Sequence, residues 1–198
     1  MSSDIDTTEH ADPVYSHKPS LMGAGWDFRL QDDALGWRVR FHEGRIPYRS
    51  IARVRLSFRP VTMQSRRFVT EIWSSAGPKL TIASTSWRSM FEQEAKDAAY
   101  GDFIRELHRR LAAAGSAALF ERGSPAALYW PGLVIVAGAA LALAVLTVRA
   151  LTTQALSTAA VMGAFAAIFL WQSVSYFRRN RPGRYRPEAL PEELVPGG

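Results

Sequence analysis

The sequence predicts an α+β membrane protein, in which a small antiparallel β barrel or sandwich, closed by one amphipathic helix, precedes a hairpin of two transmembrane helices. Three observations lead to this prediction. Apolar and polar residues alternate through residues 21–86, a helical pattern follows near residue 100, and two long runs without charge occupy 128–148 and 156–177. A chain of 198 residues has room for one ordinary domain and such a hairpin.

Residues 1–20 form a polar lead that we expect to be disordered. The segment is rich in Ser, Thr and Asp and has no apolar periodicity, so it offers little surface to bury. It also lacks the basic start and the continuous apolar stretch of a secretory signal. We therefore expect the folded domain to begin near residue 21 and to lie in the cytoplasm.

Between residues 21 and 86, the alternation of apolar and polar side chains has a period of two. This period is typical of half-buried antiparallel strands, which have one face on a core and the other in water. Turn-forming residues separate the runs at 32–33, 42–44, 59–60 and 76–78. Five strands are predicted, and 45–49 adds a short one; the five cover 26–30, 37–41, 52–58, 68–72 and 80–82.

Residues 100–114 are predicted to form the helix that closes the domain. Phe103, Ile104, Leu107 and Leu111 recur at helical spacing on one face, and charged residues take the others. Gly115 follows, and glycine is favoured just past a helix end. Strands followed by one amphipathic helix describe an α+β domain over 21–115, with the helix covering an open face or end of the sheet.

Two stretches of this domain resemble bacterial pleckstrin-homology-like (PH-like) domains. They are RIPYRSIARVRLSF at 45–58 and FIRELHRRLAAAG at 103–115. The resemblance implies a bent, roughly seven-stranded antiparallel barrel or sandwich capped by the helix, and proteins of this family often carry transmembrane hairpins. No binding residue of the family carries over to this sequence, so the resemblance implies a fold and not a function.

A juxtamembrane linker at 116–127 is expected to lead into the first transmembrane helix at 128–148. About 21 residues at about 1.5 Å per residue span roughly 30 Å, the thickness of a bilayer core. The loop at 149–155 is so short that the second helix, at 156–177, must return antiparallel to the first. Two buried helices of a soluble domain are the alternative, but the remaining chain is too small to enclose them.

Aromatic and small residues support the membrane assignment. Aromatic rings favour the bilayer interface, and they flank both runs as Tyr129, Trp130, Trp171 and Tyr176. Small residues recur at a spacing of four, which lets helix backbones approach closely in lipid; the pairs are Gly138 with Ala142 and Gly163 with Ala167. Neither run has an ionisable residue that could carry protons or ions across the membrane.

The arginines predict how the hairpin is oriented. Arg149 stands alone in the short loop, whereas the opposite ends of both helices are basic. Because positive residues remain on the cytoplasmic side, both termini are expected in the cytoplasm and the loop outside a bacterial inner membrane. A cytoplasmic Arg/Pro-rich tail, 178–198, follows the second helix, and its first arginines anchor that helix at the headgroups: Arg178, Arg179 and Arg181.

The predicted strands place several arginines opposite the core face. The apolar residues of 37–41 and 52–58 take the core face, so the outer face carries Arg38, Arg40, Arg53, Arg55 and Arg59. Like charges on neighbouring strands destabilise a sheet unless they are neutralised. Internal acids such as Asp27 or Glu71, anionic lipid headgroups and an acidic protein partner all meet this need. A solvated face with local salt bridges is the structural alternative.

The composition argues against several functions. The net charge of +6 is spread thinly along the chain, and its densest cluster adjoins an apolar run, so we expect no nucleic-acid partner. The chain has no cysteine, which excludes disulfides, thiolate catalysis and cysteine-based metal sites. Motifs such as a Gly-rich phosphate loop, G-x-S-x-G and H-E-x-x-H are also missing from the sequence.

We therefore expect a non-catalytic scaffold or interaction module, without catalytic residues, metal or cofactor. Its expected partners are the lipid bilayer and a protein or a second copy of the chain, with anionic headgroups as a further ligand. An accessory subunit of a larger membrane complex or transporter is the first alternative. A membrane-tethered enzyme that uses His42, Glu43 or His108 is the second.

Overall fold

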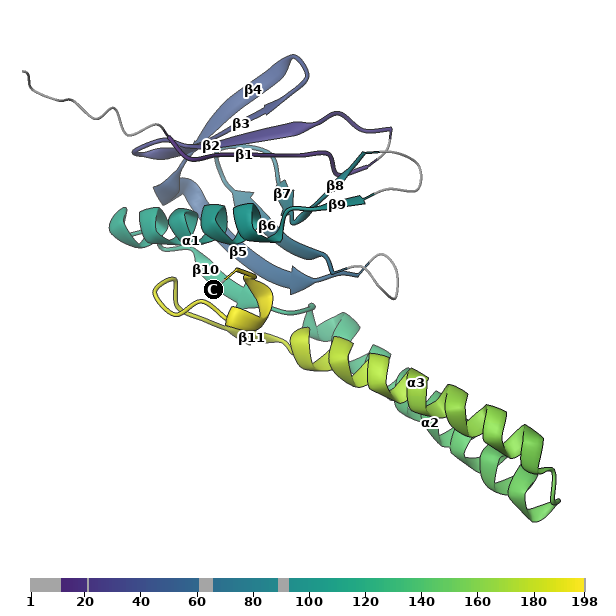
Figure 1. Cartoon of the computed structure of the whole chain (residues 1–198). Coiled ribbons are helices and arrows are strands. Elements are labelled where there is room, and N and C mark those ends of the chain that lie inside the picture. The colour runs from purple at the N-terminus through teal and green to yellow at the C-terminus, as the bar shows by residue number, and fades with distance from the viewer. Residues whose placement is uncertain (1–11, 21, 61–65, 89–92, 198) are drawn as a thin grey trace, which may run out of the picture.

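The chain folds into a β domain with two long helices projecting from it (Figure 1). The computed structural model describes residues 12–20, 22–60, 66–88 and 93–197, and the statements below concern these residues. The described strands fall into three sheets, with four, five and two strands.

The four-stranded sheet is an antiparallel meander of β1 (Val14–His17), β2 (Trp26–Leu30), β3 (Ala34–Val39) and β4 (His42–Pro47). Strand β1 lies inside the lead that we predicted to be disordered, and Tyr15 is buried in the core. That prediction is therefore wrong for residues 14–17, because four alternating residues are too few to stand out in a polar segment. Residues 1–11 lie outside the described part.

The five-stranded sheet has the order β11-β10-β5-β6-β7. Its antiparallel centre is β5 (Ile51–Phe58), β6 (Phe68–Ser74) and β7 (Leu80–Ala83). Strand β10 (Leu119–Arg122) pairs parallel with β5, and β11 (Gly183–Arg184) pairs antiparallel with β10. The stretch 116–127, predicted as a linker, thus contains a strand, and the tail contributes another.

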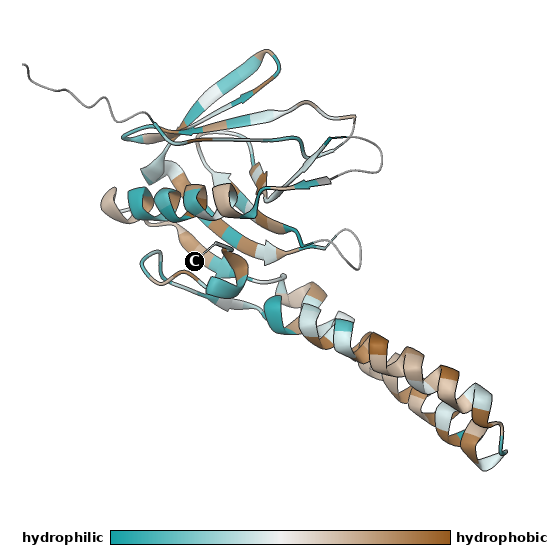
Figure 2. Cartoon of the chain, in the orientation of Figure 1, coloured by the Kyte–Doolittle hydropathy of each residue, from teal (hydrophilic) through white to brown (hydrophobic). Residues whose placement is uncertain are grey.

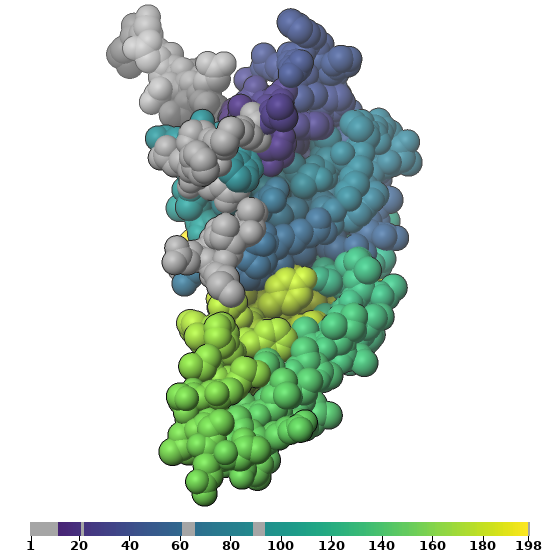
Figure 3. All heavy atoms as spheres, turned by 90° about the vertical axis from the view of Figure 1, so that its right-hand side faces the viewer, coloured from purple at the N-terminus to yellow at the C-terminus, as the bar shows by residue number. Residues whose placement is uncertain are grey.

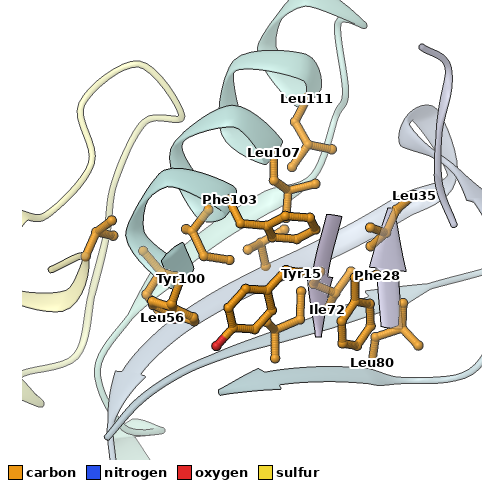
Figure 4. Close-up of a cluster of buried hydrophobic side chains, with 14 of the residues drawn as sticks. Tyr15, Phe28, Leu35, Leu56, Ile72, Leu80, Tyr100, Phe103, Leu107 and Leu111 are labelled. Carbon is orange, nitrogen blue, oxygen red and sulfur yellow. The ribbon is translucent and has the colours of Figure 1, made fainter. Parts of the chain in front are cut away.

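Helix α1 (Asp97–Ala113) covers the core that both larger sheets share. Figure 4 shows Phe103, Leu107 and Leu111 of this helix directed at side chains from the sheets, among them Phe28, Leu35 and Ile72. These side chains are almost completely buried, which confirms the predicted apolar face of the closing helix. A short ladder of β8 (Thr85–Trp87) and β9 (Gln93–Ala95) precedes α1.

The strands do not close into one barrel in the described part of the chain. A short 3-10 helix, Tyr48–Ser50, separates β4 from β5, so the two larger sheets are hydrogen-bonded separately and share only their side-chain core. The predicted core face also differs from the observed one at two residues that are exposed. Ala52 is exposed beside an irregularity in the β5–β6 pairing, and Phe41 is 97% exposed in the turn after β3.

The turn between β3 and β4 lies two residues earlier than we predicted. Val39 pairs with His42, so Arg40 and Phe41 form a two-residue turn, whereas 42–44, predicted as the turn, belong to β4. The period-two pattern ran through the turn because Arg-Phe lacks the Asn, Asp or Gly that usually marks such a position.

Helices α2 (Ala126–Thr152) and α3 (Leu156–Arg179) form an antiparallel hairpin that is long and apolar enough to cross a membrane. Figure 2 shows hydrophobic residues along most of both helices, with hydrophilic colour at the end of α3 beside the domain. The less exposed positions of α2 are 129, 132, 133, 136, 140, 143, 147 and 150, and all but 132 follow the heptad spacing of paired helices. The other faces of both helices are exposed in this chain.

Candidate functional site

The five arginines of the predicted basic face lie on two different sheets. Arg38 is in β3, where Asp27 and Glu43 are its register partners on the two neighbouring strands. Opposite charges at directly opposed positions stabilise a sheet, so Arg38 is compensated within its own sheet. Arg40 lies in the β3–β4 turn.

The other three arginines lie in or next to β5. Arg55 is paired with Glu121 of β10, and Arg59 lies 2.6 Å from Glu71, which Lys79 also contacts at 2.5 Å. The Arg53 and Arg55 guanidiniums lie 5.5 and 5.3 Å from the centre of the Trp73 ring, in the range of cation–π attraction. Glu71, one of the expected internal partners, therefore compensates part of the charge on this side, and the five arginines do not make one continuous patch.

The β3–β4 turn presents an unusual pair of residues to solvent. Arg40 has a positive φ of 51°, a conformation that costs energy for a residue with a side chain. Beside it, the Phe41 side chain is almost completely exposed. Figure 1 shows this hairpin protruding from the domain on the side away from α2 and α3.

The tail after α3 returns to the domain and is held there by Asn180. This side chain is fully buried: its Nδ2 donates to the Phe58 carbonyl at 2.7 Å, and its Oδ1 accepts from the Phe58 amide at 3.1 Å. The amide thus continues the hydrogen bonding of β10 along β5, where the backbone pairing ends at Arg122 and Leu56. Gly123 has a φ of +77°, and a Cβ there would overlap the Asn180 carbonyl.

A second contact joins the tail to α1 through Tyr185 and His108. The His108 Nδ1–H donates to the Ile104 carbonyl at 2.7 Å, so Nε2 accepts from the Tyr185 hydroxyl at 2.8 Å. Burial lowers the pKa of His108 to about 4, and burial also raises the pKa of Tyr185. His108 is therefore neutral and fully buried, with both ring nitrogens hydrogen-bonded inside the fold.

The last residues of the described chain complete this attachment. Leu194 is fully buried and Val195 nearly so, within the same core as the sheets. Arg105 donates to the Pro196 carbonyl at 3.0 Å, and that carbonyl lies so close to Gly101 that a Cβ there would overlap it. The stretch 178–198, predicted only as an Arg/Pro-rich tail, thus contributes core residues and a strand over its described part.

Aromatic rings cluster where the hairpin meets the domain. Tyr129 contacts both Trp130 and Phe177, and Tyr176 contacts Phe177, with ring centres 5.2 to 5.4 Å apart. Both ends of the hairpin therefore reach the domain at the same level. Trp171 comes earlier in α3, farther from the domain, and is 74% exposed.

The small residues of the hairpin have different surroundings. Gly163 faces α2, since a Cβ there would lie 4.0 Å from a methyl group of Thr147. Gly138 faces open space, and Ala142 and Ala167 are exposed as well. The seam between α2 and α3 thus uses only one of the four residues that we expected at a helix contact.

The remaining candidates for chemistry lie apart. His42 and Glu43 are exposed neighbours in β4, while His108 is in α1. His17 is buried between the rings of Tyr15 and Phe28, and burial lowers its pKa to about 4. Within the described ranges, no three His, Asp or Glu side chains are grouped to hold a metal ion.

No family model matches this chain, and no curated protein or solved structure shows significant similarity to it.

Proposed function

We propose that the chain is a non-catalytic, membrane-anchored interaction module. In this proposal, α2 and α3 span the inner membrane of a bacterium, and the β domain and both termini are cytoplasmic. The domain holds a protein partner at a fixed distance from the membrane.

The hairpin's exposed apolar surface supports membrane insertion. Large side chains such as Val134, Leu141 and Phe165 are more than 60% exposed, and the domain contacts the hairpin only at one end. Apolar surface on this scale is unfavourable in water. Arg149 alone at the far end of α2, against the arginines at the domain end, supports the cytoplasmic placement of the domain.

The attached tail supports a fixed orientation of the domain. A module joined to its membrane anchor by one flexible linker would sample many orientations. Here the chain enters the hairpin directly from β10 and re-enters the domain sheet at β11. Two covalent connections and a buried contact at Asn180 hold the two parts together.

One observation carries the choice of a protein partner: the Arg40-Phe41 turn. Two-residue hairpins favour residues that adopt positive φ easily, and Arg-Phe provides neither stability in the turn nor burial in the core. Residues in sparsely populated conformations cluster at functional sites, and arginines and large aromatic rings are enriched among the residues that anchor protein interfaces. The turn lies on the side of the domain away from the hairpin (Figure 1), where a cytoplasmic protein has access to it.

A site-specific photo-crosslinker tests this proposal. Phe41 in the full chain is replaced with a photoreactive phenylalanine analogue and irradiated in native membranes; exposed Met22 serves as the matched control position. We expect a discrete protein adduct at position 41 that is absent at position 22 and lost on Arg40→Glu. The same adducts at both positions, or none at 41, would refute the assignment of this turn.

We also propose a finer classification of the domain as PH-like. Strands β1 to β7, arranged as a four-stranded meander followed by a three-stranded one, precede the closing helix α1. This order supports the seven strands and capping helix that the resemblance implies. In this classification, β10 and β11 are additions that connect the domain to its anchor.

An accessory subunit of a larger membrane complex, or a homo-oligomer, is the second candidate function. The observation that favours it is the open surface at Gly138 and Ala142, which the hairpin's own seam leaves unused. Such a surface allows the close approach of another helix. Native mass spectrometry after mild detergent extraction distinguishes the two functions, because a monomer without other subunits counts against this one.

The non-catalytic part of the proposal is supported by the state of the histidines. Both His108 nitrogens are hydrogen-bonded within the fold, and His42 and Glu43 lie on an exposed strand. If the chain were a tethered enzyme, His42→Ala or Glu43→Ala would abolish a phenotype that Phe41→Ala leaves intact. We expect the opposite pattern.

A further inference from the structure

A basic hollow of about 1030 Å³ lies where the domain meets the end of α3. Its wall combines the start of β6, β10, the last turn of α3 and the tail, and five arginines line it: Arg66, Arg122, Arg178, Arg179 and Arg181. Figure 3 shows the tail between the domain and the two helices in this part of the molecule.

The positive charge of the hollow is only partly compensated. Two glutamates also line it, and one of them, Glu193, is paired with Arg122 at 2.5 Å. Arg179 lies over the Phe58 ring, 4.8 Å from its centre. Among the described residues, no carboxylate lies within ion-pair distance of Arg178 or Arg181. The hollow thus retains an excess of guanidinium groups that can bind an anion.

Along the membrane normal, the hollow lies at the level of the lipid headgroups. Ser175 lines it, and Ser175 precedes Tyr176 and Phe177 of the aromatic cluster. Aromatic clusters of this kind lie at the membrane interface, and a helix rises only about 1.5 Å per residue. The hollow therefore begins at the level of these rings and extends towards the domain, where the phosphates of a phospholipid leaflet lie.

Helix anchoring accounts for part of this arrangement but not for all of it. Arg178 and Arg179 are in the last turn of α3, where cations compensate the helix dipole and mark the cytoplasmic side. Arg66 and Arg122, however, come from the domain, and Arg181 follows the end of the helix. Arginines from separate elements converge on one hollow, as a binding site requires.

We propose that this hollow binds the phosphate of an anionic phospholipid headgroup, from a lipid whose acyl chains lie along α3. Guanidinium groups form paired hydrogen bonds with phosphate oxygens, and Arg is preferred over Lys for this geometry. The proposal rests on the membrane insertion proposed above, but it is independent of the protein partner at Phe41.

The test measures lipid binding to the full chain in nonionic detergent by native mass spectrometry. Phosphatidylglycerol is titrated into the wild type, into R66Q/R181Q and into R184Q/R186Q, a control that removes the same charge from exposed tail positions outside the hollow. Each arginine near an anionic surface contributes about fivefold in affinity, so we expect R66Q/R181Q to bind the first lipid about 25-fold more weakly. R184Q/R186Q should change the affinity by less than about twofold.

Each alternative outcome overturns the proposal. Equal losses in both variants would indicate attraction by overall charge without a site, and no loss in R66Q/R181Q would place the lipid elsewhere. If excess inorganic phosphate displaces the lipid completely and binds as tightly alone, the ligand is free phosphate. R178Q provides a second variant in case the double variant unfolds, and its affinity for the first lipid should fall about fivefold. Carbonate extraction of each variant separates these outcomes from failed membrane insertion.

Discussion

Asn180 is the position where the attachment of the tail can be tested most sharply. Its side-chain amide makes two hydrogen bonds with the Phe58 backbone, and both groups are buried. Asn180→Ala leaves a buried N–H and a buried C=O without partners, at about 1–3 kcal/mol each. We therefore expect the variant to weaken docking of the tail by about 2–6 kcal/mol.

Hydrogen exchange of the full chain in detergent measures this effect. A loss of about 2 kcal/mol speeds exchange through local opening about 30-fold, so tail peptides from 180 to 197 should exchange at least that much faster. Glu188→Ala is the matched control, because Glu188 is exposed in the same tail. If Asn180→Ala behaves like Glu188→Ala, or if the wild-type tail already exchanges freely, the buried amide does not hold the tail and the reasoning is wrong.

Three further predictions concern the packing of the domain and its tail. Tyr185→Phe leaves His108 Nε2 without its donor and should cost about 1–2 kcal/mol in urea unfolding, whereas a change below about 0.3 kcal/mol would contradict the hydrogen bond. Gly101→Ala should cost about 1–3 kcal/mol in the same assay, because its methyl group overlaps the Pro196 carbonyl; an unchanged stability would show that the tail yields without cost. Both His17 and His108 have a folded pKa of about 4, below the ordinary 6.5, so the unfolded chain binds more protons between these values. Stability should thus fall as the pH drops below about 6.5, by up to about 1.4 kcal/mol per pH unit for each histidine, and a flat profile from pH 7 to 5 would contradict their burial as neutral groups.

Local periodicity was sufficient to predict the central strands of the five-stranded sheet and the three α-helices. Strands β5, β6 and β7 follow runs with a period of two, and α1 follows a run with a helical period. These elements bury one face each, so their sequence records which face is inside. The long apolar runs predicted α2 and α3 for the same reason.

The connections that build the base of the domain leave no such local pattern. Strand β10 pairs with β5 across 66 positions, as between Glu121 and Arg55, and parallel pairing of four residues has no signature in either segment. Strand β11 has only two residues. In the sequence, Asn180 and Tyr185 look like ordinary polar residues of a tail, because their role depends on partners that only the fold brings close.

The predicted basic face shows a similar limit. Alternation placed Arg38 and Arg53 correctly on outward faces, but it could not show that β3 and β5 belong to different sheets. It also extended the strand predicted at 37–41 to Phe41, beyond the end of β3 at Val39. The exposed turn and the basic hollow, which carry the functional proposals, both arise from the chain's three-dimensional path.

Single-cysteine labelling tests the proposed topology, in which both ends of a transmembrane hairpin are built into one cytoplasmic domain. The chain has no cysteine, so each introduced thiol reports alone. A membrane-impermeant maleimide is applied to right-side-out and inverted membrane vesicles containing Thr153→Cys, Ala117→Cys or Arg186→Cys, three exposed positions in the loop, before β10 and in the tail. We expect Thr153→Cys to react only in right-side-out vesicles and the other two variants only in inverted ones. Reaction of Arg186→Cys from the same side as Thr153→Cys, or of all three from either side, would contradict this topology.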